Sequence, residues 1–436
     1  MNYFQIFLIC ILILLVIRII FTIPSMSDET IYLNMAKNFR KGLIPYKDFF
    51  YAHPPFQLIL LAPFTFSFQL VKLFISILGI GCLFLTFLIS KELFDEKVAF
   101  FSSLFFLIFP GFLIFGILGM GMFEALFFFL IGFYFLIKRK DFLASLFFTL
   151  AFFTRYLILL LFPLVFLFLK FKKRKIFDWI FYQTAFILLT FLLFFDLFGF
   201  IYFKDTIIYH FYSNIEIGIA NLIDQYLALG FFTIFLALFC LIHALFEKNR
   251  LIALFSGYPL LYDLMIIFGL KQVIYHYFIL PLPFLFIVIG YTFSKTKFFS
   301  LKIFILVIFS LCIYSNLKSL EFYYLKDYNQ VFFEVEDWVK KNSALNDLLF
   351  GEPRVLNYVS FVTERKILNN WFDSDLKFIN FYGREKVLEE VEKKRPKVLI
   401  LNELHYNFLR PILKDYKLIK EWNVIEYYPI YLFEIK

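Results

Sequence analysis

The stretch "SDETIYLNMAKNFRKGLIPYKDFFYAHPPF", residues 27–56, interrupts a chain that is otherwise dominated by apolar residues. It places Asp28, Glu29, Asp48 and His53 in one short connection between long runs of Phe, Leu and Ile. Ionisable residues inside or beside an apolar segment are costly to keep, so each needs a structural or chemical reason. The stretch separates the first two apolar segments and supplies the first candidate functional residues.

The surrounding sequence indicates a polytopic α-helical membrane protein. Of the 436 residues, 62% are hydrophobic and 23% are aromatic, and the mean hydropathy is +0.80. These values lie well outside those of soluble domains. Apolar runs close to the length that crosses a bilayer recur through the first 316 residues. All four cysteines lie inside such runs, which gives no disulfide framework.

Lys and Arg clusters predict which connections face the cytoplasm. Five short connectors hold 15 of the 24 basic residues that precede residue 317: 91–97, 138–140, 170–175, 247–250 and 294–302. The positive-inside rule places all five in the cytoplasm. We therefore expect about 11 spans in a plasma or inner membrane, a cytoplasmic amino terminus and an external loop over 23–69. Residues 1–316 would form the transmembrane domain.

The spans predicted from this pattern include one short pair. They cover residues 3–22, 70–90, 98–115, 120–137, 176–198, 226–246, 251–269, 274–292 and 303–316, with residues 141–169 between two cytoplasmic clusters. Residues 141–169 must cross and return, which gives about 20 Å in each direction. Such short helices are tolerated where they line a cavity. Arg155 lies at their turning point.

Residues 317–436 read as a small external α/β domain. They carry 19 basic and 19 acidic residues, so the net charge of +9 comes from the membrane part. The segment "REKVLEEVEKKRP" at 384–396 has a helical pattern, and "KVLIL" at 397–401 follows it as a buried strand. This domain has neither a glycine-rich phosphate loop nor a nucleophile elbow, and we expect it to be accessory.

The acidic pair in the opening stretch has both a structural and a functional explanation. Ser27 can cap a helix whose first turn carries Asp28 and Glu29, an arrangement that suits the helix dipole. Ile31 and Met35 share one face, as in a helix that lies on a membrane surface. Capping does not require two acids beside a bilayer exit, so we also expect Asp28 and Glu29 to act in catalysis.

A third acid and several cations are predicted at the same external membrane face. Glu124 lies just inside the outer end of its span, at the depth of Asp28, so the two carboxylates could share a cavity. Arg155, Lys271 and His276 supply basic groups on that side, and His53 is another candidate. Acids and cations at one membrane face indicate chemistry on a lipid-borne phosphate.

The joint order of these motifs resembles the C-type glycosyltransferases that use polyprenyl-phosphate sugars, including bacterial aminoarabinose transferases and protein O-mannosyltransferases. "DETIYLNMAKNF" is similar to the acidic opening of the family's first external loop, and "YAHPPFQLILLAPF" to the proline pair that follows. Glu124 in "MFEALFFFL" stands where the family has an acidic residue. "KQVIYHYFILPLPFLFIVIG" resembles a late span with Lys, Tyr and Leu-Pro positions, and so adds Tyr277 to the candidates.

Two positions depart from the family pattern. Ala52 and His53 replace the Glu-Lys of the aminoarabinose transferases, and Glu124 replaces the more usual Asp. The resemblance implies a sugar transferase with Asp28, Glu29 and Glu124 as catalytic residues. His53, Arg155, Lys271, His276 and Tyr277 would bind the substrate.

The implied reaction moves a sugar from a polyprenyl-phosphate donor to a lipid, protein or glycan acceptor at the outer membrane face. The acceptor would attack in one inverting displacement. No nucleic acid is implicated, no cofactor is certain, and a divalent cation with unknown ligands stays an open alternative.

Two other functional classes remain open. A transporter or flippase would use the same buried charges to bind a substrate or carry protons, although no inverted repeat is visible. A ligase or polymerase of surface glycans would share the lipid-linked donor, but would be expected to lack the acidic opening and the carboxyl-terminal domain.

Overall fold

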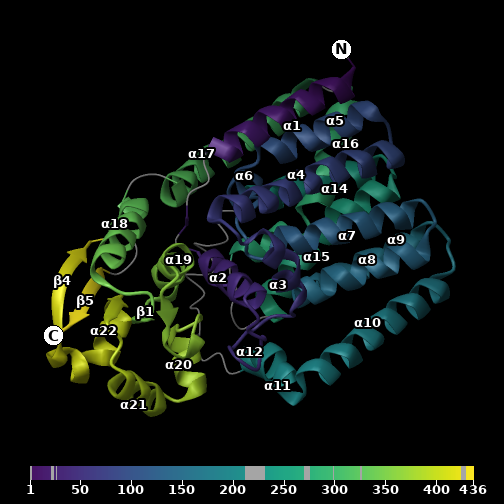
Figure 1. The fold of residues 1–436 in the computed structure, drawn as a ribbon. Helices are drawn as coiled ribbons and strands as arrows, with labels where there is room; N and C mark the ends of the chain where they lie inside the picture. The colour runs from purple at the N-terminus through teal and green to yellow at the C-terminus, as the bar shows by residue number, and fades with distance from the viewer. Residues whose placement is uncertain are drawn as a thin grey trace.

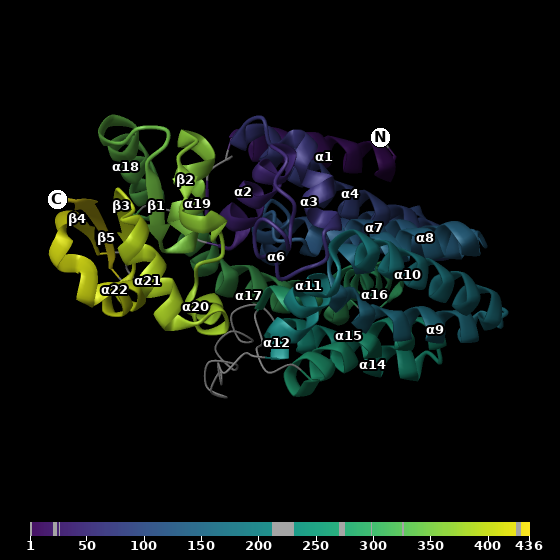
Figure 2. The ribbon, with the colours of Figure 1, turned by 60° about the horizontal axis from the view of Figure 1, so that its bottom comes forward.

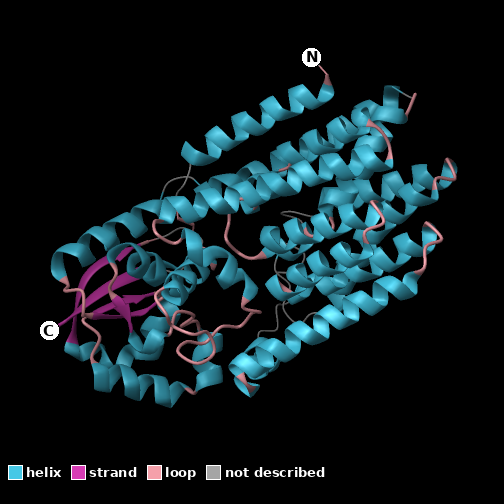
Figure 3. Cartoon of the chain, turned by 45° about the vertical axis from the view of Figure 1, so that its right-hand side comes forward, coloured by secondary structure: helices cyan, strands magenta, loops and turns pink. Residues whose placement is uncertain are grey.

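The computed structural model describes residues 2–20, 24–25, 27–211, 231–269, 275–297, 299–324, 327–423 and 429–436. A bundle of long apolar helices is joined to a smaller α/β domain at its carboxyl-terminal end (Figure 1). The strands gather in the smaller domain, and the remainder is almost entirely helical (Figure 3). A helical bundle with a small sheet agrees with the predicted fold class.

The longer elements of the bundle follow the apolar segments. They are α1 (Tyr3–Ile20), α4 (Phe68–Leu93), α5 (Glu96–Ile108), α6 (Pro110–Phe115), α7 (Met122–Ile137), α8 (Asp141–Thr154), α9 (Phe162–Phe171), α10 (Ile176–Phe198), α14 (Phe231–Phe246), α15 (Arg250–Gly269), α16 (Leu282–Lys295) and α17 (Phe299–Tyr324). Shorter elements connect them: α2 (Glu29–Arg40), α3 (Phe56–Leu61), η1 (Ala62–Phe64), η2 (Tyr156–Leu161), α11 (Phe200–Phe203), the π-helical turn η3 (Lys204–Ile208), α12 (Tyr209–Phe211) and η4 (Tyr275–Ile279).

Three of the described helices are long and apolar enough to cross a membrane, namely α4, α10 and α15, and several shorter apolar helices accompany them. The predicted span at 98–115 is broken, because Phe109 is extended and Pro110 begins a new helix. Helix α17 continues past the predicted end at residue 316 as far as Tyr324. The number of spans stays a prediction.

The smaller domain is built on a five-stranded mixed sheet. Its strands are β1 (Leu348–Gly351), β2 (Lys366–Ile367), β3 (Val398–Leu401), β4 (Tyr416–Trp422) and β5 (Ile430–Ile435), in the order β2-β1-β3-β5-β4. β1 pairs in parallel with β2 and β3, whereas β5 pairs antiparallel with β3 and β4. Its helical elements are α18 (Asp327–Asn342), α19 (Pro353–Thr363), η5 (Leu368–Asn370), α20 (Leu376–Tyr382), α21 (Arg384–Lys394), α22 (Glu403–Leu409) and η6 (Arg410–Asp415).

The apolar run at 398–401 forms the central strand β3, and all four of its residues are buried. Parallel pairing on one side and helices on both faces account for its continuous hydrophobicity. The amphipathic segment before it forms α21, with Val387 and Val391 buried. Both sequence expectations for this part of the domain are therefore confirmed.

The α/β domain packs directly on α2 (Figures 1 and 2), where α19 lies beside it. Asn34 donates to the Asn357 side chain at 2.9 Å, and Lys37 donates to the Phe361 carbonyl at 2.6 Å. Lys37 also pairs with Glu364 at 2.9 Å. Helix α2 is thus enclosed between two bodies. That it also lies along a membrane surface, as its sequence pattern suggested, stays a prediction.

Candidate active site

Asp28 stands at the amino end of α2 but does not cap it. The side chain makes no capping hydrogen bond, while Ser27 Oγ accepts from the Glu29 amide at 3.4 Å. One oxygen of Asp28, Oδ1, instead lies 3.4 Å from Arg354 Nε. The Asp28 side chain is 38% exposed, so it remains accessible to a substrate. Ser27, the expected cap, therefore contacts the first turn of α2, and the Asp28 carboxylate takes no part in capping.

Glu29 is fully buried in an ion pair that had not been foreseen. Its two carboxylate oxygens lie 2.9 and 2.7 Å from Lys72 Nζ, and one of them accepts from the Gly119 amide at 3.0 Å. Lys72 also donates to the Ile117 carbonyl at 2.7 Å. Both oxygens are used, which satisfies the buried charge of Glu29. That Glu29 acts in catalysis stays a prediction.

The same network holds the loop between α6 and α7. Tyr51 donates to Gln57 Oε1 at 3.1 Å, and Gln57 Nε2 donates to the Gly119 carbonyl at 3.0 Å. The loop ends at Gly121, whose φ of +80° is the left-handed conformation that favours glycine. A Cβ at Gly121 would lie 2.1 Å from Arg155 Nε. The loop therefore allows the backbone to approach Arg155.

Arg155 lies where α8 ends, at the predicted turning point. It is extended, with φ −149° and ψ 120°, and η2 follows it. The guanidinium is buried at 4% exposure, donates to the Met120 carbonyl and stacks 4.7 Å from the centre of the Tyr32 ring. Within the described residues, its Nε has no hydrogen-bond partner and it forms no ion pair. A buried cation without a counterion favours an anionic ligand.

Glu124 lies in the first turn of α7 and is fully buried. Among the described residues, neither carboxylate oxygen has a hydrogen-bond partner. The charges of Arg155 and Glu29 both act on it. Glu124 is thus close enough to Arg155 and Glu29 to feel their charges. That it shares a cavity with Asp28 stays a prediction.

His53 lies at the entrance to this group. Its Nε2 is 3.0 Å from the Tyr32 hydroxyl, and its carbonyl accepts from the Tyr46 hydroxyl at 2.6 Å. Burial lowers the pKa of the His53 imidazole well below its ordinary value, and the nearby Arg155 charge lowers it further. Both effects favour the neutral imidazole, and the Tyr32 hydroxyl is its hydrogen-bond partner. That His53 binds the substrate stays a prediction.

The late-span candidates fall partly outside the described residues. His276 and Tyr277 lie in η4, with their rings 4.8 Å apart, and the charges of Asp28 and Arg155 act on both. The structure therefore brings these two residues to the same place as the opening stretch. Lys271 lies outside the described residues.

The α/β domain contributes an acidic loop that sequence reasoning missed. Burial raises the pKa of Asp373 well above its ordinary value, and the charges of Asp375 and Asp28 raise it further. Asp375 caps α20 through the Phe378 amide at 2.7 Å. Lys377 lies 4.3 Å from the centre of the Tyr209 ring. The domain that was expected to be accessory therefore faces the candidate site.

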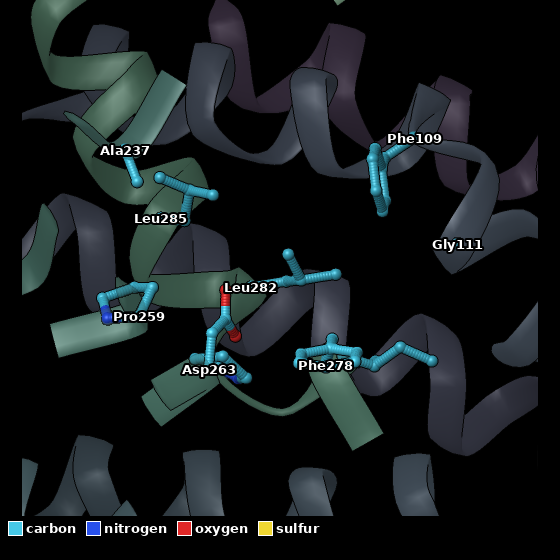
Figure 4. Close-up of a pocket in the computed structure, with 10 residues that line it drawn as sticks. Phe109, Gly111, Ala237, Pro259, Asp263, Phe278, Leu282 and Leu285 are labelled. Carbon is cyan, nitrogen blue, oxygen red and sulfur yellow. The ribbon is translucent and has the colours of Figure 1, made fainter. Parts of the chain in front are cut away.

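A small cavity lies beside η4, between α6, α14, α15 and the start of α16 (Figure 4). Phe109, Pro259, Phe278 and Leu282 line it, and the Asp263 carboxylate points into it (Figure 4). Its volume of about 20 Å³ is sufficient for about one water molecule. It contains none of the predicted site residues and is too small for a sugar.

A metal site is not evident among the described residues, where no group of three His, Cys, Asp or Glu side chains has metal-binding geometry. Asp28 pairs with Arg354, and Glu29 pairs with Lys72. A divalent cation therefore stays a prediction without identified ligands.

Comparison with known proteins identifies the fold. Neither a protein-family model nor a curated protein matches the sequence. The structure is similar to ArnT from Cupriavidus metallidurans bound to undecaprenyl phosphate, with a TM-score of 0.70 and 10% identity over 99% of this chain and 97% of that one.

Two structures of an oligosaccharyltransferase from Archaeoglobus fulgidus are also similar. AglB in complex with an inhibitory peptide and a dolichol-phosphate gives a TM-score of 0.54 and 13% identity, covering 97% of this chain and 74% of that one. The complex with Zn and sulfate gives 0.53 and 14%, covering 96% and 72%. The C-type glycosyltransferase fold expected from the sequence is therefore confirmed.

Removing one member of the buried Glu29–Lys72 pair should strongly destabilise the protein. Lys72→Met leaves an unpaired buried carboxylate, which costs about 3–5 kcal/mol. The double variant Glu29→Gln/Lys72→Met should regain most of this loss. Thermal unfolding in detergent compares the variants, and an unchanged midpoint for Lys72→Met would contradict the pairing.

Gly121→Ala should destabilise the protein more than Gly42→Ala. Both glycines have positive φ, +80° and +101°, so both substitutions cost about 1–2 kcal/mol of backbone strain. A Cβ at Gly121 would also collide with Arg155, whereas nothing lies within 4 Å of a Cβ at Gly42. Overpacking should add about 1–3 kcal/mol at Gly121. Equal unfolding midpoints would contradict the close approach.

Asp373→Asn should stabilise the protein at pH 7.5 but not at pH 4. Because the folded pKa of Asp373 is raised, its contribution is fully present below the unfolded value of about 4. That contribution is lost as the pH rises towards the folded pKa. Thermal unfolding at both pH values tests this, with the exposed Asp337→Asn as the control. A lower midpoint for Asp373→Asn at pH 7.5 would reverse the expected sign.

Proposed function

We propose that this protein is an integral-membrane glycosyltransferase that moves a sugar from a polyprenyl-phosphate donor to an acceptor hydroxyl or amine. The observation that carries the proposal is the buried Arg155, which has no ion pair among the described residues and shares its surroundings with the accessible carboxylate of Asp28. A phosphate would supply the missing counterion, and the carboxylate would supply a base.

In this proposal, the cationic Arg155 and the acidic Asp28 lie on opposite sides of the sugar that is transferred. Arg155 comes from the bundle, with the neutral His53 and the Tyr32 hydroxyl beside it as hydrogen-bonding groups. Asp28 faces the α/β domain, where Asp373 and Asp375 also lie. Donor phosphate would therefore bind on the bundle side, and the acceptor would approach between α2 and the domain.

In the proposed reaction, Asp28 removes the proton from the acceptor hydroxyl as general base. The acceptor oxygen attacks the anomeric carbon in a single inverting displacement. The bond between that carbon and the phosphate oxygen breaks, and its electron pair leaves with the polyprenyl phosphate. Arg155 stabilises the negative charge that grows on the phosphate. Glu29 acts through position, since its pairing with Lys72 fixes the start of α2.

Glu124 takes a supporting role in this proposal. It is fully buried and lies within the field of Arg155, so it orients the guanidinium rather than contacting the acceptor. His276, Tyr277 and Lys271 would complete the phosphate side. No step passes through a divalent cation.

The solved structures that share this fold support a lipid carrier of this type. ArnT was solved with undecaprenyl phosphate and AglB with a dolichol-phosphate. Both carriers present a phosphate at the membrane surface with an apolar tail, which suits the exposed apolar face of α10. We therefore assign the protein to a plasma or inner membrane, with the α/β domain on the external side.

The proposal is tested by the release of free polyprenyl phosphate from labelled polyprenyl-phosphate hexoses, with purified protein and membrane extract as the acceptor source. Wild type should release the lipid phosphate. Asp28→Asn should lower the rate by about 10²–10⁴-fold because it removes the base. Asp337→Asn, on the exposed side of α18, is the matched control and should retain full activity.

Each other outcome has a separate meaning. No release by wild type from any donor would favour a transporter or flippase. Equal release by wild type and Asp28→Asn would retain the transferase but assign the base to another residue.

A further inference from the structure

A residue of the α/β domain contacts the Asp28 side chain. Arg354, the second residue of α19, lies with Nε 3.4 Å from Asp28 Oδ1. The main chain at the same position accepts from Thr30 Oγ1 at 2.7 Å, so two bonds join the start of α2 to the start of α19. These contacts connect positions 326 and 324 residues apart in the chain.

The carboxylate of Asp28 is free of competing roles. It does not cap α2, and Arg354 is the basic residue at ion-pair distance from it within the described part of the chain. The contact uses Oδ1, and no described residue pairs with Oδ2. This contact restrains one oxygen of the carboxylate and leaves the other open to a substrate.

Other ionisable groups around Asp28 are mostly acidic or neutral. Those whose titration responds to its charge are Tyr32 of α2, Tyr209 of α12, His276 and Tyr277 of η4, Glu352 at the start of α19, and Asp373 and Asp375 before α20. Arg354 also lies 3.7 Å from Glu352. Without the guanidinium, like charges would push the Asp28 carboxylate away from this group.

We propose that Arg354 is a positioning residue for catalysis, which sets the orientation of the Asp28 carboxylate towards the acceptor. This inference rests on the proposed function, since it concerns the same base. It gives the α/β domain a part in the chemistry. The domain supplies the group that aims the base, while the bundle supplies the groups that bind the donor phosphate.

The test compares Arg354→Gln, Arg354→Lys and the control Lys341→Gln in the polyprenyl-phosphate release assay. Lys341 forms an exposed ion pair with Asp337 on α18 and contacts none of the candidate site residues in the described part of the chain. Arg354→Gln should lower kcat by up to about 10²-fold, the effect of misplacing a reacting group by about 1 Å. KM for the donor should stay within about twofold, because the donor phosphate binds elsewhere.

Arg354→Lys retains a cation and should recover part of the lost kcat, and added guanidinium ion should partly restore activity to Arg354→Ala. Thermal unfolding of each variant checks that it is folded. If Arg354→Gln is unfolded, the inference is tested by Arg354→Lys and by the guanidinium rescue of Arg354→Ala.

Three results would overturn the inference: unchanged kcat in Arg354→Gln, a loss confined to the donor KM, or no recovery with either cation. Failure of the proposed function itself is distinct, because wild type would then release no lipid phosphate from any donor.

Discussion

The buried ion pair between Glu29 and Lys72 is the constraint on which the candidate site depends. A carboxylate and an ammonium removed from water are tolerated only when nearly all of their hydrogen-bonding capacity is satisfied. Here the Gly119 amide and the Ile117 carbonyl complete the set. The pair thereby fixes the start of α2, the outer end of α4 and the loop before α7 as one unit. Because Asp28 is adjacent to Glu29, this unit also fixes the position of Asp28.

Charge is divided across that unit in a way that matches the proposed chemistry. The bundle presents the buried guanidinium of Arg155, which forms no ion pair within the described residues, and the α/β domain presents carboxyl groups at Asp373 and Asp375. Burial makes both kinds of group costly to keep. A site for a phosphate leaving group and a protic acceptor requires a guanidinium and carboxyl groups of this kind next to an accessible carboxylate.

Sequence reasoning predicted much of the scaffold and singled out Arg155 and His276, which lie near Asp28, while the roles of the candidate site residues stay predictions. The apolar segments, the helix that follows Asp28 and the buried strand at 398–401 each carry a local pattern, and a local pattern is sufficient to predict them. Asp28 and Arg155 could be singled out because a charge in an apolar surrounding is visible in the sequence.

The residues that were missed depend on contacts between distant segments. Lys72 falls inside the predicted span at 70–90 and was not singled out, and Glu29, its partner 43 residues away, was predicted to be catalytic. Gly121 matters only because Arg155 approaches it. Arg354 and Asp373 lie in a domain without any recognised motif, and nothing local indicates that they face residue 28. Arg354 and Asp373 come near residue 28 only because the α/β domain packs against the bundle. Periodicity and composition do not predict that packing.

The enclosure of α2 also has a consequence for how the protein is made. The helix is synthesised near the beginning of the chain, yet one of its faces is covered by α19, which emerges more than 300 residues later. Until then Asn34 and Lys37 lack their partners and water must satisfy them. The bundle can therefore assemble during synthesis, but the contacts around Asp28 form only after α19 has been made. A chain that stops before α19 would lack Arg354, whose Nε lies 3.4 Å from Asp28.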